Sequence, residues 1–379
     1  MEIKNKSIVI SKEEKAADIV SCSSMLLTSK EGNPYWFRTC DLNTNLWWAG
    51  AHIVSFPAGH EIQFEGNNTA DKSKYKILGV TYSGEDTWLL DGINSEGLIG
   101  GLLFLNEGTS VKSACEGYTG VMALEVITKL LANCADVNDV IEQASKMQVL
   151  SISMAGQSLG ATMHYSFTDK LGKTVILEAD DSERPGIFRI YTDDENIGVM
   201  TNSPSYNKQI KNLQWYISQS PELKCGINGE PITSLIIDGK EIKGDENAEH
   251  VALTGTFPGT YCSYDRFVRL AVLKALNDDG RNISDYEMII QGTGIMNAVY
   301  APHTKGVFHY AKFDENMKPV DSKEFYTQYL VMYNLREKEL YMKAYDDIAW
   351  TKYSLNSCPD DKVKKFDVNH NRLDAIINA

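Results

Sequence analysis

The stretch SCSSMLLTSKEGNPYWFRTCD, residues Ser21–Asp41, is built like a β-hairpin. Two runs of apolar and β-forming residues flank the turn-like segment Lys-Glu-Gly-Asn at positions 30–33. If the turn centres on the Glu-Gly pair, residues whose numbers add to about 62 or 63 face each other, and Cys22 lies opposite Cys40 or Asp41. The sequence thus predicts a thiol at the start of the first strand, facing the end of the second.

Composition limits the kind of protein that this chain can be. Of its 379 residues, 43% are hydrophobic and 23% are charged, which is enough to bury a sizeable core in one large domain or two ordinary ones. The formal net charge of −14 argues against nucleic acid as a partner, because a nucleic-acid footprint needs clustered Lys and Arg. An acidic surface usually serves solubility.

Targeting segments and cysteine spacing add two further expectations. No apolar run approaches the roughly 18 residues of a membrane span. The N-terminal MEIKNKSIVISKEEKAADIVS lacks the apolar segment of a signal peptide, so the sequence predicts a cytoplasmic protein with no membrane partner. The seven cysteines are widely spread and contain no Cys-x-x-Cys pair, which indicates neither a zinc ribbon nor a disulfide scaffold.

Runs of predicted strands alternate with runs of predicted helices. Residues 22–106, 163–202 and 324–345 have strand and turn patterns. Helical patterns mark residues 121–131, 137–147, 210–217 and 266–276, and Asp136 is the expected cap of the second. Residues 284–287 form a capping-box pattern. No linker or internal repeat interrupts the chain, so the pattern predicts a single α+β domain rather than a βαβ winding.

Several common chemical signatures are absent from the sequence. There is no Gly-x-x-x-x-Gly-Lys-Ser/Thr loop, no Gly-x-Gly-x-x-Gly, no His-Glu-x-x-His and no Gly-x-Ser-x-Gly. The seven histidines are scattered, and none pairs with another at ligand spacing. On spacing alone Cys22 also fits a plain core residue, so its role has to be judged from the wider set of motifs.

Motifs in a fixed order along the chain carry a resemblance to a known family. They are Cys22-Ser-Ser, Arg38-Thr-Cys-Asp41, Asp91–Gly97, Asn133-Cys134 with Asp139–Ile141, Tyr165–Asp169, Ile197–Pro204 and Asp265–Arg269. From Cys22 to about Trp350 the chain closely resembles the choloylglycine hydrolase family of N-terminal nucleophile hydrolases, which contains penicillin V acylases and bile salt hydrolases. The resemblance implies that residues 22–379 form one domain, a four-layer αββα sandwich with two antiparallel sheets between outer helices.

The resemblance assigns the nucleophile and two of its neighbours. Cys22 would attack the substrate carbonyl and form a thioester once it is the first residue of the mature chain. Its own α-amino group, with an ordinary pKa of about 7.7–8.0, would serve as the base. Arg38 resembles the family arginine that favours the thiolate, and Asp41 resembles the carboxylate that orients the α-amino group. Because Arg38 and Asp41 are three residues apart, we expect a bulge near Thr39-Cys40 to bring them together.

Three further residues complete the implied site. Asn202 resembles the family asparagine whose side-chain amide donates to the developing oxyanion, and the second donor, a backbone N–H, falls at Phe104. Bile salt hydrolases typically carry Asn at this second place and penicillin V acylases Tyr, so Phe104 keeps the backbone donor but leaves the substrate preference open. Arg266 resembles the family arginine that supports the site, although alone it also fits a residue that caps or pairs on its own helix.

The implied function is hydrolysis of a linear, non-peptide C–N amide bond in a small-molecule acyl amide. A penicillin V acylase-like activity is the first hypothesis, because Phe104 is closer to Tyr than to Asn; a bile salt or another N-acyl amide is the alternative substrate. This mechanism requires no metal and no organic cofactor, and the resemblance predicts a homo-oligomer, a tetramer. A hypothesis of another class is a non-catalytic binding homologue whose N-terminal segment stays attached.

The segment before Cys22 sets one more requirement. Met1 is the only methionine before Cys22, so removal of an initiator methionine does not expose the α-amino group of Cys22. No signal peptidase site is apparent. We therefore predict that residues 1–21 are a propeptide and that the Ser21–Cys22 bond is cut autocatalytically by the Cys22 thiol.

Overall fold

The computed structural model describes residues 20–42, 50–82, 85–154, 157–159, 163–219, 232–249, 258–278, 283–303, 309–313, 319–366 and 368. Runs of strands alternate with runs of helices along these residues, and the α+β class predicted from the sequence is confirmed. Within the same residues, every helix is too short or too polar to span a bilayer.

Two antiparallel sheets form the centre of the molecule. The six strands of the first sheet, in spatial order, are β16 (Val199–Met200), β1 (Val20–Thr28), β2 (Pro34–Leu42), β21 (Tyr326–Asn334), β22 (Glu339–Ala344) and β23 (Thr351–Ser354). The eight strands of the second sheet are β15 (Arg189–Tyr191), β14 (Thr174–Glu178), β13 (Met163–Thr168), β8 (Ile99–Phe104), β7 (Glu85–Asn94), β6 (Ile77–Tyr82), β3 (Ile53–Phe56) and β24 (Lys364–Phe366). Strands that are far apart in the sequence therefore become neighbours.

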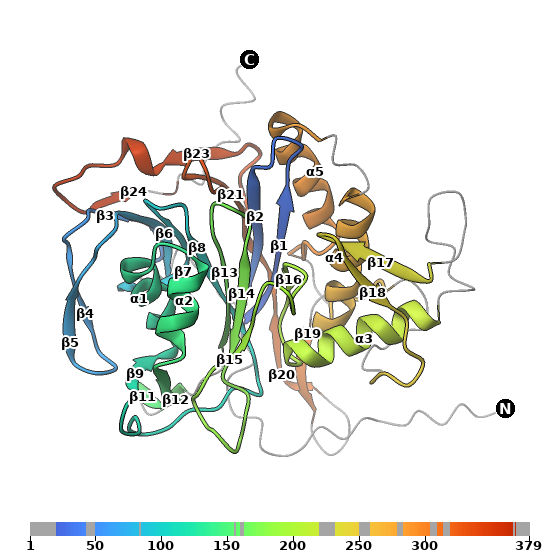
Figure 1. Ribbon diagram of the computed structural model, residues 1–379, viewed down its shortest axis with the longest axis horizontal. Coiled ribbons are helices and arrows are strands. Elements are labelled where there is room, and N and C mark those ends of the chain that lie inside the picture. Colours follow the sequence, from blue (N-terminus) through green and yellow to red (C-terminus); the bar gives the residue numbers. More distant parts are fainter. Residues whose placement is uncertain are drawn as a thin grey trace.

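Helices lie on both sides of this pair of sheets (Figure 1). On one side α1 (Val126–Asn133) packs against β7 and β8, and α2 (Val137–Ala144) packs against β13 and β14. On the other side α4 (Ser263–Asp278) packs against β1 and β16, α5 (Asp285–Asn297) packs against β2, and α3 (Tyr206–Ser218) packs against α4. Because β1 also contacts β8, the two sheets face each other between the two groups of helices.

Short two-stranded pairs and two 3-10 helices complete the described elements. The pairs are β4 (Glu61–Phe64) with β5 (Thr69–Lys72), β9 (Thr119–Met122) with β10 (Met147–Leu150), β11 (Ile152–Met154) with β12 (Gln157–Leu159), β17 (Ser234–Ile237) with β18 (Lys240–Lys243), and β19 (His309–Phe313) with β20 (Pro319–Glu324). The 3-10 helices are η1 (Ala123–Glu125) and η4 (Leu355–Ser357).

The helix predicted for residues 121–131 is partly wrong. Val121 belongs to β9, and the chain becomes helical only at η1 and α1. β9 pairs in parallel with β10, so the backbone at Val121 finds its hydrogen-bond partners in a strand from a distant segment. The same pairing ends the next helix early: α2 begins after the Asp136 cap, as predicted, but stops at Ala144, and Met147 starts β10.

The β-hairpin predicted at Ser21–Asp41 is confirmed. β1 and β2 pair in a regular antiparallel register in which Cys22 faces Cys40 and Ser21 faces Asp41. The turn contains Gly32 with φ of 76°, a left-handed conformation that glycine adopts without steric cost. The expected bulge near Thr39-Cys40 is located differently: the register shifts between Cys40 and Asp41, and only against β21, while pairing with β1 stays regular.

Successive residues of β2 face opposite sides of the first sheet. The Trp36 ring lies against Gly101 of β8, where any side chain would collide with it. The next residue, Phe37, lies in the same way against Gly292 of α5. Even-numbered side chains of β2 therefore face the second sheet, and odd-numbered ones face the helices. The same alternation holds for β1, so Cys22 lies on the face toward the second sheet.

Candidate active site

Cys22 is fully buried in β1, between the two sheets. Its Sγ atom accepts a hydrogen bond from Nη2 of Arg38 at 3.4 Å, and the same nitrogen lies 3.7 Å from Sγ of Cys40. Ser21 is joined to Cys22 and is also buried, so this is the geometry of the uncut chain.

The surroundings of Cys22 make its thiol unusually acidic. Burial by itself raises the pKa of the thiol. A hydrogen bond with Cys40, the positive charge and hydrogen bond of Arg38, and the backbone N–H of Asp41 act in the opposite direction and outweigh burial. The result is a pKa lowered from 9.0 to about 6, so most of the thiol is ionised at neutral pH.

A buried carboxylate holds Arg38 in place. Nη1 of Arg38 forms an ion pair with Oδ2 of Asp91 in β7. The carboxylate of Asp91 also accepts hydrogen bonds from the hydroxyl groups of Tyr329 at 2.7 Å and Tyr333 at 2.5 Å. Nη2 of Arg38 donates to the carbonyl of Leu102 at 2.9 Å. Because all of these side-chain groups are buried, the positive charge stays fixed beside the thiol.

The sequence assigns no role to Asp91 or to the two tyrosines. The sequence does contain a signal for Asp91, because this carboxylate directly follows the apolar residues Leu89 and Leu90. A buried carboxylate needs a cation or several hydrogen-bond donors. No comparable signal marks Tyr329 and Tyr333. They reach Asp91 only because β21 pairs with β2 in the folded chain.

Arg266 reaches Cys22 from the opposite face, from α4. Its Nη1 donates to the carbonyl of Cys22 at 2.5 Å and to the hydroxyl of Ser23. Its Nη2 donates to Oγ of Ser21 at 2.7 Å and to Oδ1 of Asn202 at 2.8 Å. Arg266 therefore contacts the residues on both sides of the Ser21–Cys22 bond and orients the side chain of Asn202.

Asn202 follows β16 and links Cys22 to the end of β8. Its Oδ1 accepts a hydrogen bond from the backbone N–H of Cys22 at 2.6 Å. Its Nδ2 donates to the carbonyl of Phe104 at 3.1 Å. The side chain thus lies between the nitrogen of Cys22 and the backbone at which the second oxyanion donor is predicted.

Three side chains without a sequence-predicted role, Ser263, His164 and Glu178, fix the backbone around Asn202. The N–H of Asn202 donates to Oγ of Ser263 at 2.8 Å. The carbonyl of Thr201 lies 2.6 Å from Nε2 of His164, and Nδ1 of His164 lies 2.8 Å from Oε1 of Glu178. Since a carbonyl oxygen only accepts, Nε2 of His164 carries the hydrogen. These contacts join four separate chain segments, which explains why spacing along the sequence does not reveal them.

Asp41 lies at the end of β2, opposite Ser21, and is buried. Its Oδ1 accepts a hydrogen bond from Oγ1 of Thr327 at 2.7 Å. Burial raises the pKa of Asp41 to about 7, although the charge of Arg266 opposes the rise. Regular pairing with β1 places Asp41 on the face of Arg266, so Arg38 and Asp41 approach Cys22 from opposite faces without a bulge in the hairpin.

All six residues of the predicted site lie around one point in the structure. They are Cys22, Arg38, Asp41, Asn202, Arg266 and the backbone of Phe104. Of the predicted propeptide, residues 1–19 lie outside the described residues. Among the residues that the structure describes, no three His, Cys, Asp or Glu side chains gather in a way that would hold a metal ion.

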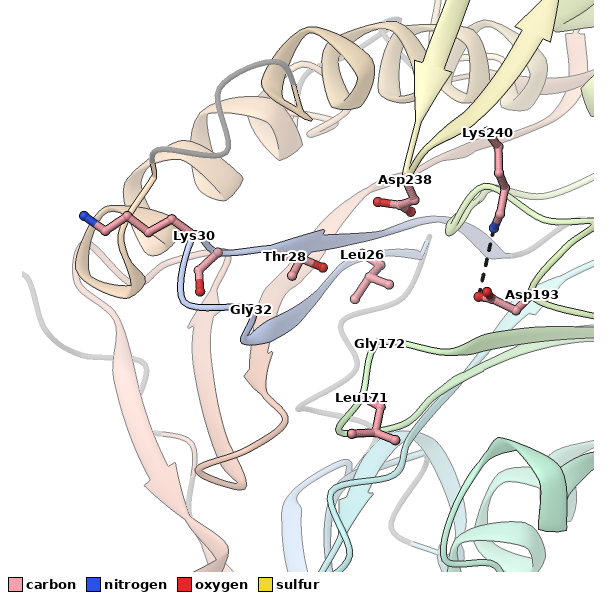
Figure 2. Close-up of a pocket in the computed structure, with 10 residues that line it drawn as sticks. Leu26, Thr28, Lys30, Gly32, Leu171, Gly172, Asp193, Asp238 and Lys240 are labelled. Carbon is pink, nitrogen blue, oxygen red and sulfur yellow. Dashed lines mark ion pairs between the residues drawn. The ribbon is translucent and has the colours of Figure 1, made fainter.

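A hollow of about 330 Å³ opens at the turn end of the β1–β2 hairpin (Figure 2). Its lining residues are Leu26, Thr28, Ser29, Lys30, Gly32, Leu171, Gly172, Asp193, Asp238 and Lys240. Leu26 lies four residues along β1 from Cys22, about 13 Å at the usual rise of a strand. This hollow is therefore separate from the surroundings of Cys22.

Comparison with known proteins identifies the class of enzyme to which the chain belongs. The family model for linear amide C–N hydrolases, choloylglycine hydrolase family, matches residues 22–364. The match covers most of the chain, and the protein belongs to this family. It is a hydrolase that acts on carbon–nitrogen bonds in linear amides.

Individual relatives agree with this assignment. A bile salt hydrolase/transferase of Clostridium perfringens is 27% identical over 259 residues, which cover 67% of this chain and 71% of the relative. The crystal structure of a mutant conjugated bile acid hydrolase from Clostridium perfringens has a TM-score of 0.71 at 21% identity and covers 92% of this chain and 97% of the other. The structure of penicillin V acylase from Agrobacterium tumefaciens has a TM-score of 0.64 at 19% identity, covering 91% and 90%. The two solved structures share the fold of this protein.

Proposed function

We propose that the protein is an N-terminal nucleophile amidase that uses Cys22 to hydrolyse a small acyl amide through a thioester. The observation that carries the proposal is the position of Cys22: its sulfur lies 3.4 Å from the Arg38 guanidinium and its nitrogen 2.6 Å from Oδ1 of Asn202. A thiolate beside a fixed cation is a nucleophile, and the neighbouring nitrogen becomes a base once it is a free amine. The family match, which begins at residue 22, supports the same starting point.

The first reaction is removal of residues 1–21, which leaves residues 22–379 as a single domain. The Cys22 thiolate attacks the carbonyl carbon of Ser21, the C–N bond to Cys22 breaks, and the nitrogen takes up a proton. Water then hydrolyses the resulting thioester, which releases residues 1–21 and regenerates the thiol. Arg266 supports this step because it donates to Oγ of Ser21 and to the carbonyl of Cys22, and so holds both sides of the bond.

The mature site repeats the same chemistry on a substrate amide. Cys22 attacks the substrate carbonyl, and its α-amino group, whose ordinary pKa is about 7.7–8.0, moves the proton to the leaving amine. Asp41 orients that amino group. The negative oxygen of the tetrahedral intermediate accepts hydrogen bonds from Nδ2 of Asn202 and the N–H of Phe104, a type of contribution worth on the order of 3 kcal/mol per donor.

The first candidate substrate is penicillin V or a similar aryl-acyl amide. Phe104 supports this choice, because its aromatic ring is closer to the Tyr typical of penicillin V acylases at the second oxyanion position than to the Asn typical of bile salt hydrolases. Conjugated bile salts are the second candidate, and the bile salt hydrolase relatives, at 22–27% identity, favour them. An N-acyl amide of another kind fits the same mechanism.

Two further features belong to the proposal. The contacts of α1 and α2 with one sheet, of α4 and α5 with the other, and of β1 with β8 support a four-layer αββα sandwich. The family resemblance supports a homotetramer, which size-exclusion chromatography with light scattering tests directly.

The deciding experiment combines intact mass with a substrate panel. Active enzyme is expected to have lost residues 1–21 and to hydrolyse penicillin V faster than glycine- or taurine-conjugated bile salts; the reverse order would favour the second candidate. Cys22→Ala should keep residues 1–21. Full activity in a chain that still carries Met1 contradicts the mechanism, and a native protein that is never cut and never active favours a non-catalytic binding homologue.

A further inference from the structure

Cys22 and Cys40 face each other directly across the β1–β2 hairpin. Both thiols are free and fully buried. One nitrogen of Arg38 lies 3.4 Å from the first sulfur and 3.7 Å from the second. Two sulfur atoms on one face of a hairpin that share a hydrogen-bond donor are close neighbours. They form a dithiol, although the hydrolytic mechanism uses only Cys22.

The ladder gives this pair the geometry that a disulfide needs. The N–H of Ser29 donates to the carbonyl of Asn33 at 2.9 Å, which makes these residues a hydrogen-bonded pair. Hydrogen-bonded and non-hydrogen-bonded pairs alternate along an antiparallel ladder, so Cys22 and Cys40, an odd number of positions further on, form a non-hydrogen-bonded pair. Cα atoms in such pairs are about 4.5 Å apart. Disulfides span Cα separations of about 4.4–6.8 Å, so the bond requires little backbone movement.

The charges around the two sulfurs favour reaction in a defined order. Cys22 is the thiolate and therefore the sulfur that reacts first with an electrophile. Burial and the hydrogen bond and negative charge of Cys22 raise the pKa of Cys40, while the charge of Arg38 opposes them. When Cys22 is oxidised it loses its negative charge. Arg38 is then free to stabilise the thiolate of Cys40 beside an oxidised sulfur.

We propose that Cys22 and Cys40 form a reversible disulfide, with hydrogen peroxide as oxidant, and that this bond switches amide hydrolysis off. The inference rests on the proposed role of Cys22 as nucleophile. The Cys22 thiolate attacks one peroxide oxygen, the O–O bond breaks, and a sulfenic acid and water result once a proton is taken up. The Cys40 sulfur then attacks the sulfenic sulfur, the S–S bond forms, and the hydroxyl leaves as a second water. Two thiols lose two electrons and two protons, and the peroxide becomes two waters.

The consequence is reversible inactivation instead of damage. A disulfide blocks the nucleophile but returns to two thiols when another thiol reduces it. Without Cys40, the sulfenic acid of Cys22 is exposed to further peroxide and proceeds to sulfinic acid, which thiols do not reverse. Cys40 thus protects Cys22 while the protein is oxidised.

The test follows activity and the bond itself in cleaved enzyme. The protein is treated with hydrogen peroxide and then with dithiothreitol, and hydrolysis is measured with penicillin V and a glycine-conjugated bile salt. We expect activity to be lost and then regained, the oxidised protein to be lighter by two hydrogen atoms, and non-reducing peptide mapping to show a Cys22–Cys40 link. In Cys40→Ser the fraction of starting activity that dithiothreitol restores should fall on the order of tenfold, with Cys22 found as sulfinic acid. Cys115→Ser, which removes an exposed thiol, should recover like the unchanged protein.

Three results separate this inference from the proposed function. Equal recovery in Cys40→Ser and the unchanged protein, or oxidation of Cys22 with no link to Cys40, overturns the inference. Peptide mapping of the unchanged chain needs no assay of hydrolysis, so it decides the matter even if Cys40→Ser fails to fold. Hydrolysis that continues while the Cys22–Cys40 link is complete overturns the role of Cys22 as nucleophile and leaves the dithiol standing.

Discussion

Two buried arginines contact Cys22 from opposite faces of β1, and they differ in the partners that surround them. Arg38, between the sheets, has a carboxylate as a partner: it pairs with Asp91, which two tyrosine hydroxyls also contact. Arg266, from α4, donates to carbonyl, hydroxyl and amide oxygens that carry no charge. Burial lowers the pKa of Arg266, whereas the groups around Arg38 outweigh burial and raise its pKa.

The partners of each arginine indicate what it does. A cation with a buried counter-ion is a permanent part of the core, so Arg38 supplies a charge that the thiol always experiences. The hydrogen-bond acceptors of Arg266 are neutral, and the one carboxyl group that acts on it, Asp41, has a pKa raised to about 7, so Arg266 acts mainly through the direction of its hydrogen bonds. Arg266 therefore orients residues 21–23 and Asn202, the residues that take part in the proposed cut and in the proposed hydrolysis.

The largest expected effect comes from Cys22, which Arg38 and Arg266 contact from opposite faces of β1. Cys22→Ala should abolish both removal of residues 1–21 and amide hydrolysis, while leaving both arginine networks in place, because Arg266 contacts the backbone carbonyl of Cys22. Intact mass and hydrolysis assays measure the two losses, and circular dichroism checks the fold. Turnover retained in Cys22→Ala would mean that Cys22 is not the nucleophile, and the contacts of both arginines with Cys22 would then have no catalytic role.

Removal of each arginine in turn tests the comparison directly. Arg38→Met leaves Asp91 buried without a cation and should lower the free energy of unfolding by roughly 3–5 kcal/mol. Arg266→Met leaves neutral acceptors and Asp41, whose raised pKa lets it take up a proton, and should cost less, roughly 1–3 kcal/mol. Denaturant titration measures both values. Equal losses would show that the charge of Asp91 does not distinguish the two regions.

The same pair of variants predicts a difference in pH dependence. Alkylation of Cys22 in cleaved enzyme follows the thiolate fraction, so its rate should rise with pH and reach half its plateau below the 9.0 of an ordinary thiol. Loss of the Arg38 charge makes the thiolate less favourable, so Arg38→Met should move this midpoint to higher pH. Arg266→Met should move it less. If Arg38→Met leaves the midpoint of the pH profile unchanged, the charge of Arg38 does not stabilise the Cys22 thiolate.

Substitution of Asn202 tests the face of β1 on which Arg266 and Asn202 form hydrogen bonds with each other and with Cys22. Asn202→Ala should lower kcat by roughly 10²–10³-fold with a smaller change in KM, because the lost donor acts mainly on charge in the transition state. Steady-state kinetics on the substrate found in the panel measures both constants. A rise in KM with kcat unchanged would make Asn202 a binding residue for the ground state.

The smallest effect comes from the outer part of the Arg38 network. Tyr333→Phe removes one hydrogen bond to the Asp91 carboxylate and should lower the free energy of unfolding by roughly 1.5–3 kcal/mol. Tyr165→Phe is a matched control, since its buried hydroxyl donates to the neutral carbonyl of Ala123, and it should cost only about 0.5–1.5 kcal/mol. Thermal or denaturant unfolding compares the two. A larger loss in Tyr165→Phe would contradict the idea that the Asp91 region is organised around charge.

Local patterns made the hairpin and its register predictable. The turn at residues 30–33 and the period of two along each strand place Cys22 opposite Cys40 or Asp41 without any distant contact, and the structure has Cys40 there. Caps at Asp136 and Ser284 were predictable for the same reason, because a cap bonds to residues three positions away or fewer. The helix predicted at Val121 was wrong, because the conformation of Val121 depends on pairing with β10, which lies in another segment of the chain.

The sequence by itself determined the hairpin, the α+β class and the order of motifs that marks the family. Only the tertiary structure decided which face of β1 each arginine approaches, and that Asp91, Tyr329 and Tyr333 surround Arg38. The physical reason is that the partners of each arginine come from strands and helices far apart in the chain. The hairpin alone brings Arg38, Cys40 and Asp41, the groups that lower the pKa of the Cys22 thiol, next to Cys22. Only the packing of the second sheet supplies Asp91, which holds the Arg38 charge in place.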